Sequence, residues 1–273
     1  MHNKFAITVC LICTLLLTSC ASEPEPLSAE TRQRLGKVYL SSAGATGETF
    51  FHADFDNGGT GGALKGAGKG AVQGLDDCVN GALGAGILAP VVLVVCAPIK
   101  MTANMVQGSS AGGAVVIPEE TLANMEQQTN QVLKQADLSP ALVATLDDVS
   151  QKHPALAQYE ITHGILPPPE NGDTLNDVAA NWGYQTVMEI QVTKAGFDSD
   201  EGRVPMLHLS MTANVRLVEA TTGSVIQQQD YHYNSSPQSV AAWFRDDYRN
   251  LFRELALANQ AIAADIVKNT FTY

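Results

Sequence analysis

Ser110 lies in a motif that is typical of nucleophilic enzymes. Residues 108–112 match G-x-S-x-G, in which the serine of an esterase attacks a carbonyl carbon. The motif needs a strand before it, a helix after it, and an acid followed by a histidine downstream. Asp177 followed by His208 or His232 supplies that order. However, the residues before Ser110 lack strand alternation, and Gly/Ser-rich tracts match this motif easily, so a serine hydrolase is the least favoured hypothesis.

The six histidines are scattered along the chain and do not indicate a metal site. No pair has the H-E-x-x-H spacing of a zinc protease. His208 and His232 belong to neighbouring predicted strands and are expected to face each other on a polar surface. The Asp-x-Asp pairs at 54–56 and 198–200 lie in Gly-rich loops but lack the distal glutamate of a calcium loop. We therefore predict no metal and no cofactor.

The first 20 residues predict a lipid anchor. Lys4 precedes an apolar run from Phe5 to Leu17, which is shorter than the about 20 residues of a membrane span and has signal-peptide proportions. Residues 17–20 (LTSC) resemble a bacterial lipobox, which implies that Cys20 is acylated and becomes the first residue. Ala21 favours the outer membrane. An ordinary secretory signal that ends in a chance cysteine is the alternative.

Residues 20–33 are polar, contain two prolines, and predict an extended tether after the acylated cysteine. Cysteine usage agrees with export, because Cys10 and Cys13 would leave with the signal peptide. Cys78 and Cys96 remain as an even pair. In an oxidising compartment this pair is expected to form a disulfide that closes an apolar loop; two buried free thiols are the alternative.

The charge excludes a general nucleic-acid binder. The chain of 273 residues has 28 acidic and 16 basic residues, a net charge of −12, and no basic footprint. One segment departs from this acidity, since between Asn57 and Pro118 two aspartates stand against three lysines. Fourteen of the 23 glycines fall between Gly58 and Gly113. This nearly neutral, glycine-rich segment is therefore distinct from the rest of the chain.

The glycines of residues 57–117 have the spacing of a helix-packing ridge. They recur every four residues at Gly58, Gly62, Gly66, Gly70 and Gly74, and the spacing returns at Gly108 and Gly112. Each costs about 0.8–1 kcal/mol relative to alanine in a helix, which close approach of another helix can offset. Residues 78–99 carry no charge and are divided by Pro90 and Pro98. We predict an apolar helical hairpin, which packs on its own domain, enters a bilayer, or joins two copies.

The rest of the chain predicts an α+β domain with an antiparallel sheet of three to five strands packed against helices. Strands are expected at residues 36–41 and 48–55, on either side of a glycine-containing turn, and at 185–195, 204–219 and 224–233. Helices are expected after Pro118, after the caps Ser139 and Thr174, and, for the long final helix, after the cap Ser236. Strand 204–219 alternates strictly, so one face packs and the other meets water or a partner. The apolar stripe of the final helix, including Trp243, is expected to be core.

The stretch from Trp182-Gly183-Tyr184 through the strands, and on into the helix from Tyr233 to Ile266, resembles proteobacterial envelope lipoproteins. Their α/β domains are related to the curli-secretion-channel lipoprotein and to the N-terminal domain of the Tol-system propeller protein. The resemblance covers roughly residues 30–55 and 174–268. It implies an accessory or assembly role in the envelope, without chemistry.

These features predict a periplasm-facing lipoprotein of the outer membrane. Its predicted segments are a signal peptide at 1–19, the acylated cysteine and tether at 20–33, the first strands at 34–56, the hairpin at 57–117, and the rest of the domain at 118–273. The first hypothesis is a non-enzymatic component that binds an envelope protein or its own copies and has no small-molecule substrate. The second is an oligomeric channel or export component whose hairpins cross the membrane. The third is the Ser110 hydrolase.

Overall fold

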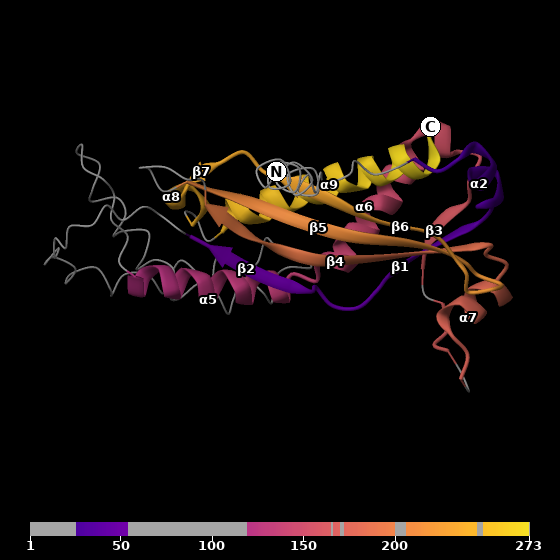
Figure 1. Ribbon diagram of the computed structural model, residues 1–273, viewed down its shortest axis with the longest axis horizontal. Coiled ribbons are helices and arrows are strands. Elements are labelled where there is room, and N and C mark those ends of the chain that lie inside the picture. Colours follow the sequence, from indigo (N-terminus) through magenta and orange to yellow (C-terminus); the bar gives the residue numbers. More distant parts are fainter. Residues whose placement is uncertain are drawn as a thin grey trace, which may run out of the picture.

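The protein is described by a computed structural model at residues 26–53, 119–164, 166–169, 172–199, 206–244 and 248–272, which form one sheet with helices (Figure 1). The elements are α2 (Ala29–Arg34), β1 (Val38–Ser42), β2 (Glu48–His52), α5 (Glu119–Gln135), α6 (Leu138–Lys152), η4 (Pro154–Leu156), β3 (Ile161–His163), α7 (Leu175–Asn181), β4 (Thr186–Ser199), β5 (Met206–Glu219), β6 (Val225–Asn234), β7 (Gln238–Ser239), α8 (Val240–Trp243) and α9 (Arg249–Phe271). The α+β class is therefore confirmed.

The sheet is mixed, so the prediction of a purely antiparallel sheet is wrong. Its strand order is β3-β1-β4-β5-β6, with β2 also paired to β4 and β7 to β5. β4, β5 and β6 form the predicted antiparallel meander. β1, β2 and β3 run parallel to their partners. Parallel pairing needs a crossover connection, and here α5, α6 and α7 lie in the chain between β2 and β4.

β1 and β2 do not pair with each other, although the sequence places them on either side of a turn. They follow one another along the same edge of β4, where Ser42 pairs with Ile190 and Glu48 with Lys194. The residues between them pass a bulge in β4. Gly47 donates its N–H to the Val192 carbonyl at 2.9 Å, and a Cβ at this position would lie 2.3 Å from a backbone oxygen of β4. The glycine therefore serves a close approach of two backbones.

The start of α6 contacts β4 at its bulge, between the stretches of β4 that pair with β1 and with β2. The sequence predicts Ser139 as the N-cap, but the helix begins at Leu138, after Asp137 in the left-handed region. Ser139 is instead buried, and its hydroxyl accepts the Val192 N–H at 2.9 Å. The cap prediction is wrong because a distant strand, rather than the local helix, supplies the donor for this hydroxyl. The cap predicted at Thr174 is confirmed, since Thr174 forms a capping box with Asp177 at the start of α7.

The predicted long final helix is divided in two. Ser236 does not cap it; the cap of α8 is Ser239, whose hydroxyl accepts the Ala242 N–H. α8 is short, and α9 starts after Tyr248, which has a positive φ of 62°. The division lets Trp243 pack against Phe197 at 4.8 Å between ring centroids and donate its indole N–H to the Leu207 carbonyl.

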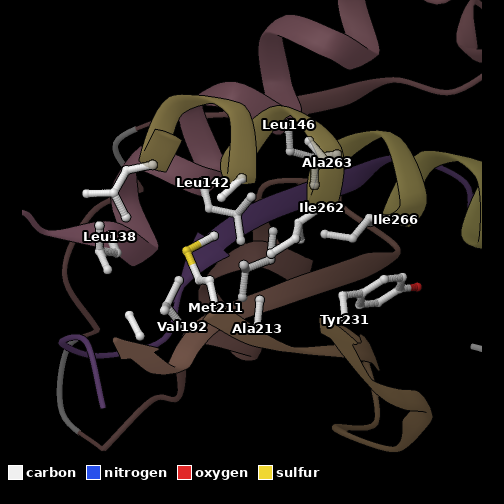
Figure 2. Packing of buried hydrophobic residues seen from close by; sticks show 14 of the residues in the cluster. Leu138, Leu142, Leu146, Val192, Met211, Ala213, Tyr231, Ile262, Ala263 and Ile266 are labelled. Carbon is white, nitrogen blue, oxygen red and sulfur yellow. The ribbon is translucent and has the colours of Figure 1, made fainter. Parts of the chain in front are cut away.

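The main core lies between the sheet and the helices α6 and α9 (Figure 2). Alternate residues of β5 point into it, as predicted. The apolar stripe predicted for the final helix is also buried; it consists of Val240, Trp243, Phe244, Tyr248, Leu251, Leu255, Ile262 and Ile266. Figure 2 shows Leu142 and Leu146 of α6 beside Ile262 and Ala263 of α9, above Met211. α5 lies along β2 at the edge of the sheet (Figure 1). None of the described helices is long and apolar enough to cross a membrane.

The N-terminal chain joins the fold earlier than expected. The tether predicted for 20–33 extends into α2, and Leu27 is already buried. The Leu27 N–H donates to the Asn269 carbonyl near the end of α9 at 3.1 Å. The side chain of Ser28 caps α2 by accepting the Thr31 N–H. An extended tether can therefore apply only to the residues before Leu27.

Candidate functional site

Most residues that the sequence singles out lie outside the described residues. They are Cys20, Cys78, Cys96, Ser110 and the ridge glycines Gly58, Gly62, Gly66, Gly70, Gly74, Gly108 and Gly112. The lipid anchor, the disulfide, the helical hairpin and the serine nucleophile therefore stay predictions.

His208, one of the two histidines proposed to assist Ser110, is not brought together with Asp177. Asp177 accepts hydrogen bonds from the backbone N–H and hydroxyl of Thr174 at the start of α7, and these bonds lower its carboxyl pKa. α7 packs near Val187, at the start of β4. His208 is opposite Asp198, eleven residues farther along β4, or about 35 Å at the rise of a strand. The contacts of Asp177 are those of the capping box at the start of α7.

His208 and His232 do not face each other, so that expectation is wrong. The register of β5 and β6 places His232 opposite Thr212, and Thr212 Oγ1 lies 3.1 Å from His232 Nδ1. Asp198 instead pairs with His52, with Oδ1 and Nδ1 2.9 Å apart. Sequence alternation identifies the face of each residue, but not the register that selects its partner. Within the part of the chain that the structure describes, no three His, Cys, Asp or Glu side chains are grouped to hold a metal ion.

The best candidate site is the sheet surface turned away from α6 and α9, here called the polar face. Its members on the meander are Glu189, Gln191, Lys194 and Asp198 of β4; His208, Ser210, Thr212, Asn214 and Arg216 of β5; and Gln228, Asp230, His232 and Asn234 of β6. Those of β5 are half-buried and those of β6 are exposed. A second small cluster of Tyr39, Ala179, Val187 and Ala220 covers only the end of this face, beneath α7.

Cross-strand hydrogen bonds hold the side chains of the polar face in place. Arg216 donates to Glu189 Oε2 at 2.9 Å, and Asn214 donates to Asp230 Oδ1 at 2.7 Å. Gln228 donates to Asn214 at 3.3 Å, which extends the network. Paired charges and amides fixed on a sheet present a defined pattern of donors and acceptors, which suits recognition of a polar surface. Sequence analysis predicted this face but missed these pairs, since each needs the strand register.

Strand β6, at the edge of the polar face, is held in place by side chains on its opposite side, which faces α9. Tyr231 is buried on the opposite side of β6, and burial raises its pKa to about 12. Tyr233 donates to Glu254 Oε1 of α9 at 2.5 Å; burial, together with this hydrogen bond, raises the pKa of Tyr233 to about 12. Two tyrosines thus attach β6 to α9 while His232 between them points outward.

No family model and no curated protein matches this chain. Among solved structures it is similar to the hypothetical protein CT253 from Chlamydia trachomatis (14% identity, TM-score 0.33, covering 48% of this chain and 81% of that one). It is also similar to the lipoprotein GNA1162 from Neisseria meningitidis (13%, 0.29, 44% and 88%) and to the dodecameric PelC from Paraburkholderia phytofirmans (10%, 0.31, 50% and 77%). The resemblance to the curli and Tol proteins stays a prediction.

Proposed function

We propose that this chain is a non-enzymatic lipoprotein of the bacterial outer membrane, acylated at Cys20, whose periplasmic α+β domain binds another envelope protein through the polar face. The observation that carries the proposal is the position of Leu27. It is packed into the domain only seven residues after the cysteine of the LTSC motif. Acylation of Cys20 would therefore hold a folded binding domain close to a membrane surface.

The polar face supports the binding part of the proposal. Its charged groups Glu189 and Arg216 are paired with each other, so a partner would not have to neutralise an isolated buried charge. Its outward amides on Asn214 and Gln228 are already ordered by hydrogen bonds, which reduces the entropy lost when a partner binds.

Acylation is tested on the protein isolated from membranes. Mass spectrometry of its N-terminal peptide is expected to show Cys20 as the first residue with a diacylglyceryl group and an amide-linked acyl chain. Cys20→Ala should abolish the lipid mass and leave the signal peptide uncleaved. A mature N-terminus at another residue, without lipid, would contradict the anchor.

Binding through the polar face is tested by photo-crosslinking in intact cells. A photoreactive residue at Gln228, which is exposed on the polar face, is expected to give a discrete crosslinked product. The matched control is Leu257, which is 45% exposed on α9 and lies on the other side of the sheet. A product of the same mass from both positions, or from neither, would refute a specific role for the polar face.

A further inference from the structure

Two of the exposed large apolar side chains lie at one end of the sheet. Among the described residues, Trp182 is 58% exposed, Val225 is 48% exposed and Leu257 is 45% exposed. Trp182 precedes β4, and Val225 begins β6 after the turn from β5. The first residue of β4, Thr186, is opposite the last residue of β5, so Trp182 and Val225 flank the same end. This end is called the near end.

The N-terminal chain enters the fold at the near end. Thr186 donates its hydroxyl hydrogen to the Leu35 carbonyl at 2.8 Å, and Arg34 lies 3.9 Å from Glu219. Leu27, which precedes α2, is bonded to Asn269 at the end of α9. Figure 1 shows α2, α7 and the C-terminus gathered at the right-hand end of the molecule. The N-terminal chain, described from Pro26 on, thus lies at the end where Trp182 and Val225 are exposed.

The end of α7 directs Trp182 outward. Trp182 is the C-cap of this helix, and Gly183 follows with a φ of 83°, a left-handed conformation that turns the chain sharply into β4. The next aromatic residue, Tyr184, packs inward against Tyr39 with ring centroids 5.3 Å apart. Lys37 lies over the Tyr184 ring at 4.8 Å, so this turn is well supported.

The length of the tether limits how the domain can lie on a membrane. Seven residue steps from Cys20 to Leu27 span at most about 25 Å. β4 alone has 14 residues and spans about 46 Å. An orientation with the opposite end against the bilayer would carry Leu27 beyond the reach of the tether. The domain must therefore approach the bilayer with its near end or with one side.

We propose that the near end faces the bilayer that holds the acyl chains of Cys20, and that Trp182 inserts among the lipid headgroups. This inference rests on the proposed acylation. Tryptophan favours the interface between headgroups and acyl chains, because its ring is apolar and its indole N–H stays hydrated. One tryptophan binds a membrane weakly, but the anchor keeps it at high local concentration, so the weak contact is enough to orient the domain.

The test uses the acylated full chain in vesicles of phosphatidylethanolamine and phosphatidylglycerol that contain brominated lipid, which quenches tryptophan within the bilayer. The chain has two tryptophans, and Trp243 is fully buried in the core, so quenching reports on Trp182. Quenching is expected in the wild type and is expected to be lost in Trp182→Phe. Adding Leu257→Trp to that variant places an indole about 18 Å before Asn269 along α9 and should not restore quenching.

Flotation of the same samples separates the two proposals. If the wild type does not float with the vesicles, or Cys20→Ser floats equally well, the proposed acyl anchor fails, and this inference with it. If the wild type floats but brominated lipid quenches nothing, the anchor stands and the orientation is overturned. Shielding of Trp182 from iodide without lipid quenching would mean that a protein covers it. Equal quenching at Leu257→Trp would mean that the domain lies on its side; each result overturns the inference.

Discussion

The two faces of the sheet are built from the same strands but differ in what holds their side chains. Met211 and Thr212 are neighbours on β5: Met211 is fully buried beneath α6 and α9, whereas Thr212 is half-exposed and contacts His232. Burial of apolar area is worth about 25 cal/mol per Å², while an exposed polar pair exchanges one hydrogen bond with water for another. The helix-covered face therefore carries the stability, and the polar face is the surface that we propose binds a partner.

The prediction with the largest expected effect compares Met211 with its neighbour Thr212. Met211→Ala is expected to lower the free energy of unfolding by about 2–5 kcal/mol, because it leaves a cavity in a packed core. Thr212→Ala should cost less than about 1 kcal/mol, because only an exposed hydrogen bond and strand propensity change. Urea unfolding measures both. Similar losses for the two variants would contradict the assignment of stability to one face.

The second test concerns a polar group on the covered face. Ser139→Ala removes the acceptor of the Val192 N–H at the bulge of β4 and should cost about 1–3 kcal/mol, since a buried donor is left unpaired. The matched control is Thr145→Ala, on the same helix, which removes a hydroxyl bonded only to the Ala141 carbonyl. That change orphans no buried donor and should be nearly neutral. A neutral Ser139→Ala would show that the bulge finds another acceptor.

The third test concerns how the free energy of unfolding depends on pH in the alkaline range. Burial raises the Tyr231 pKa to about 12 from an ordinary value of 10, so the unfolded state loses this proton first. The resulting stability is complete below pH 10 and is lost as the pH rises towards 12, by at most about 2.7 kcal/mol. Tyr231→Phe should remove this part of the pH dependence, as measured by urea unfolding between pH 8 and 11.5. An unchanged slope would mean that Tyr231 does not titrate with unfolding.

How far the sequence predicts this fold depends on whether a signal is local. The alternation of β5, the cap at Thr174 and the apolar stripe near the C-terminus each depend on residues close together in the chain, and all are confirmed, although the stripe is shared between α8 and α9. The parallel pairing of β1 with β4 and the use of Ser139 by Val192 depend on contacts between distant segments. A local sequence pattern cannot specify such contacts. The predictions of a purely antiparallel sheet and of Ser139 as a helix cap are wrong for this reason.

The same limit applies to the candidate site. The sequence predicts a polar surface opposite the core, since Asn214 and Arg216 alternate with buried residues. It does not predict that Arg216 meets Glu189, because that pair depends on the register of two strands. Sequence patterns single out Trp182 only through the resemblance to envelope lipoproteins. Its exposure follows from the turn at Gly183. Register and turn geometry therefore carry the functional detail.

The smallest expected effect is the most useful for separating folding from binding. In a double-mutant cycle of Arg216→Ala and Glu189→Gln, the coupling free energy is expected to be below about 1 kcal/mol, because both side chains remain partly exposed and water screens the pair. It should decrease further in high salt. Because a change of this size should leave the variants folded, any loss of the Gln228 crosslink in them reports on the polar face itself. A coupling above about 2 kcal/mol would instead show that the polar face stabilises the fold, and the contrast between the two faces would no longer hold.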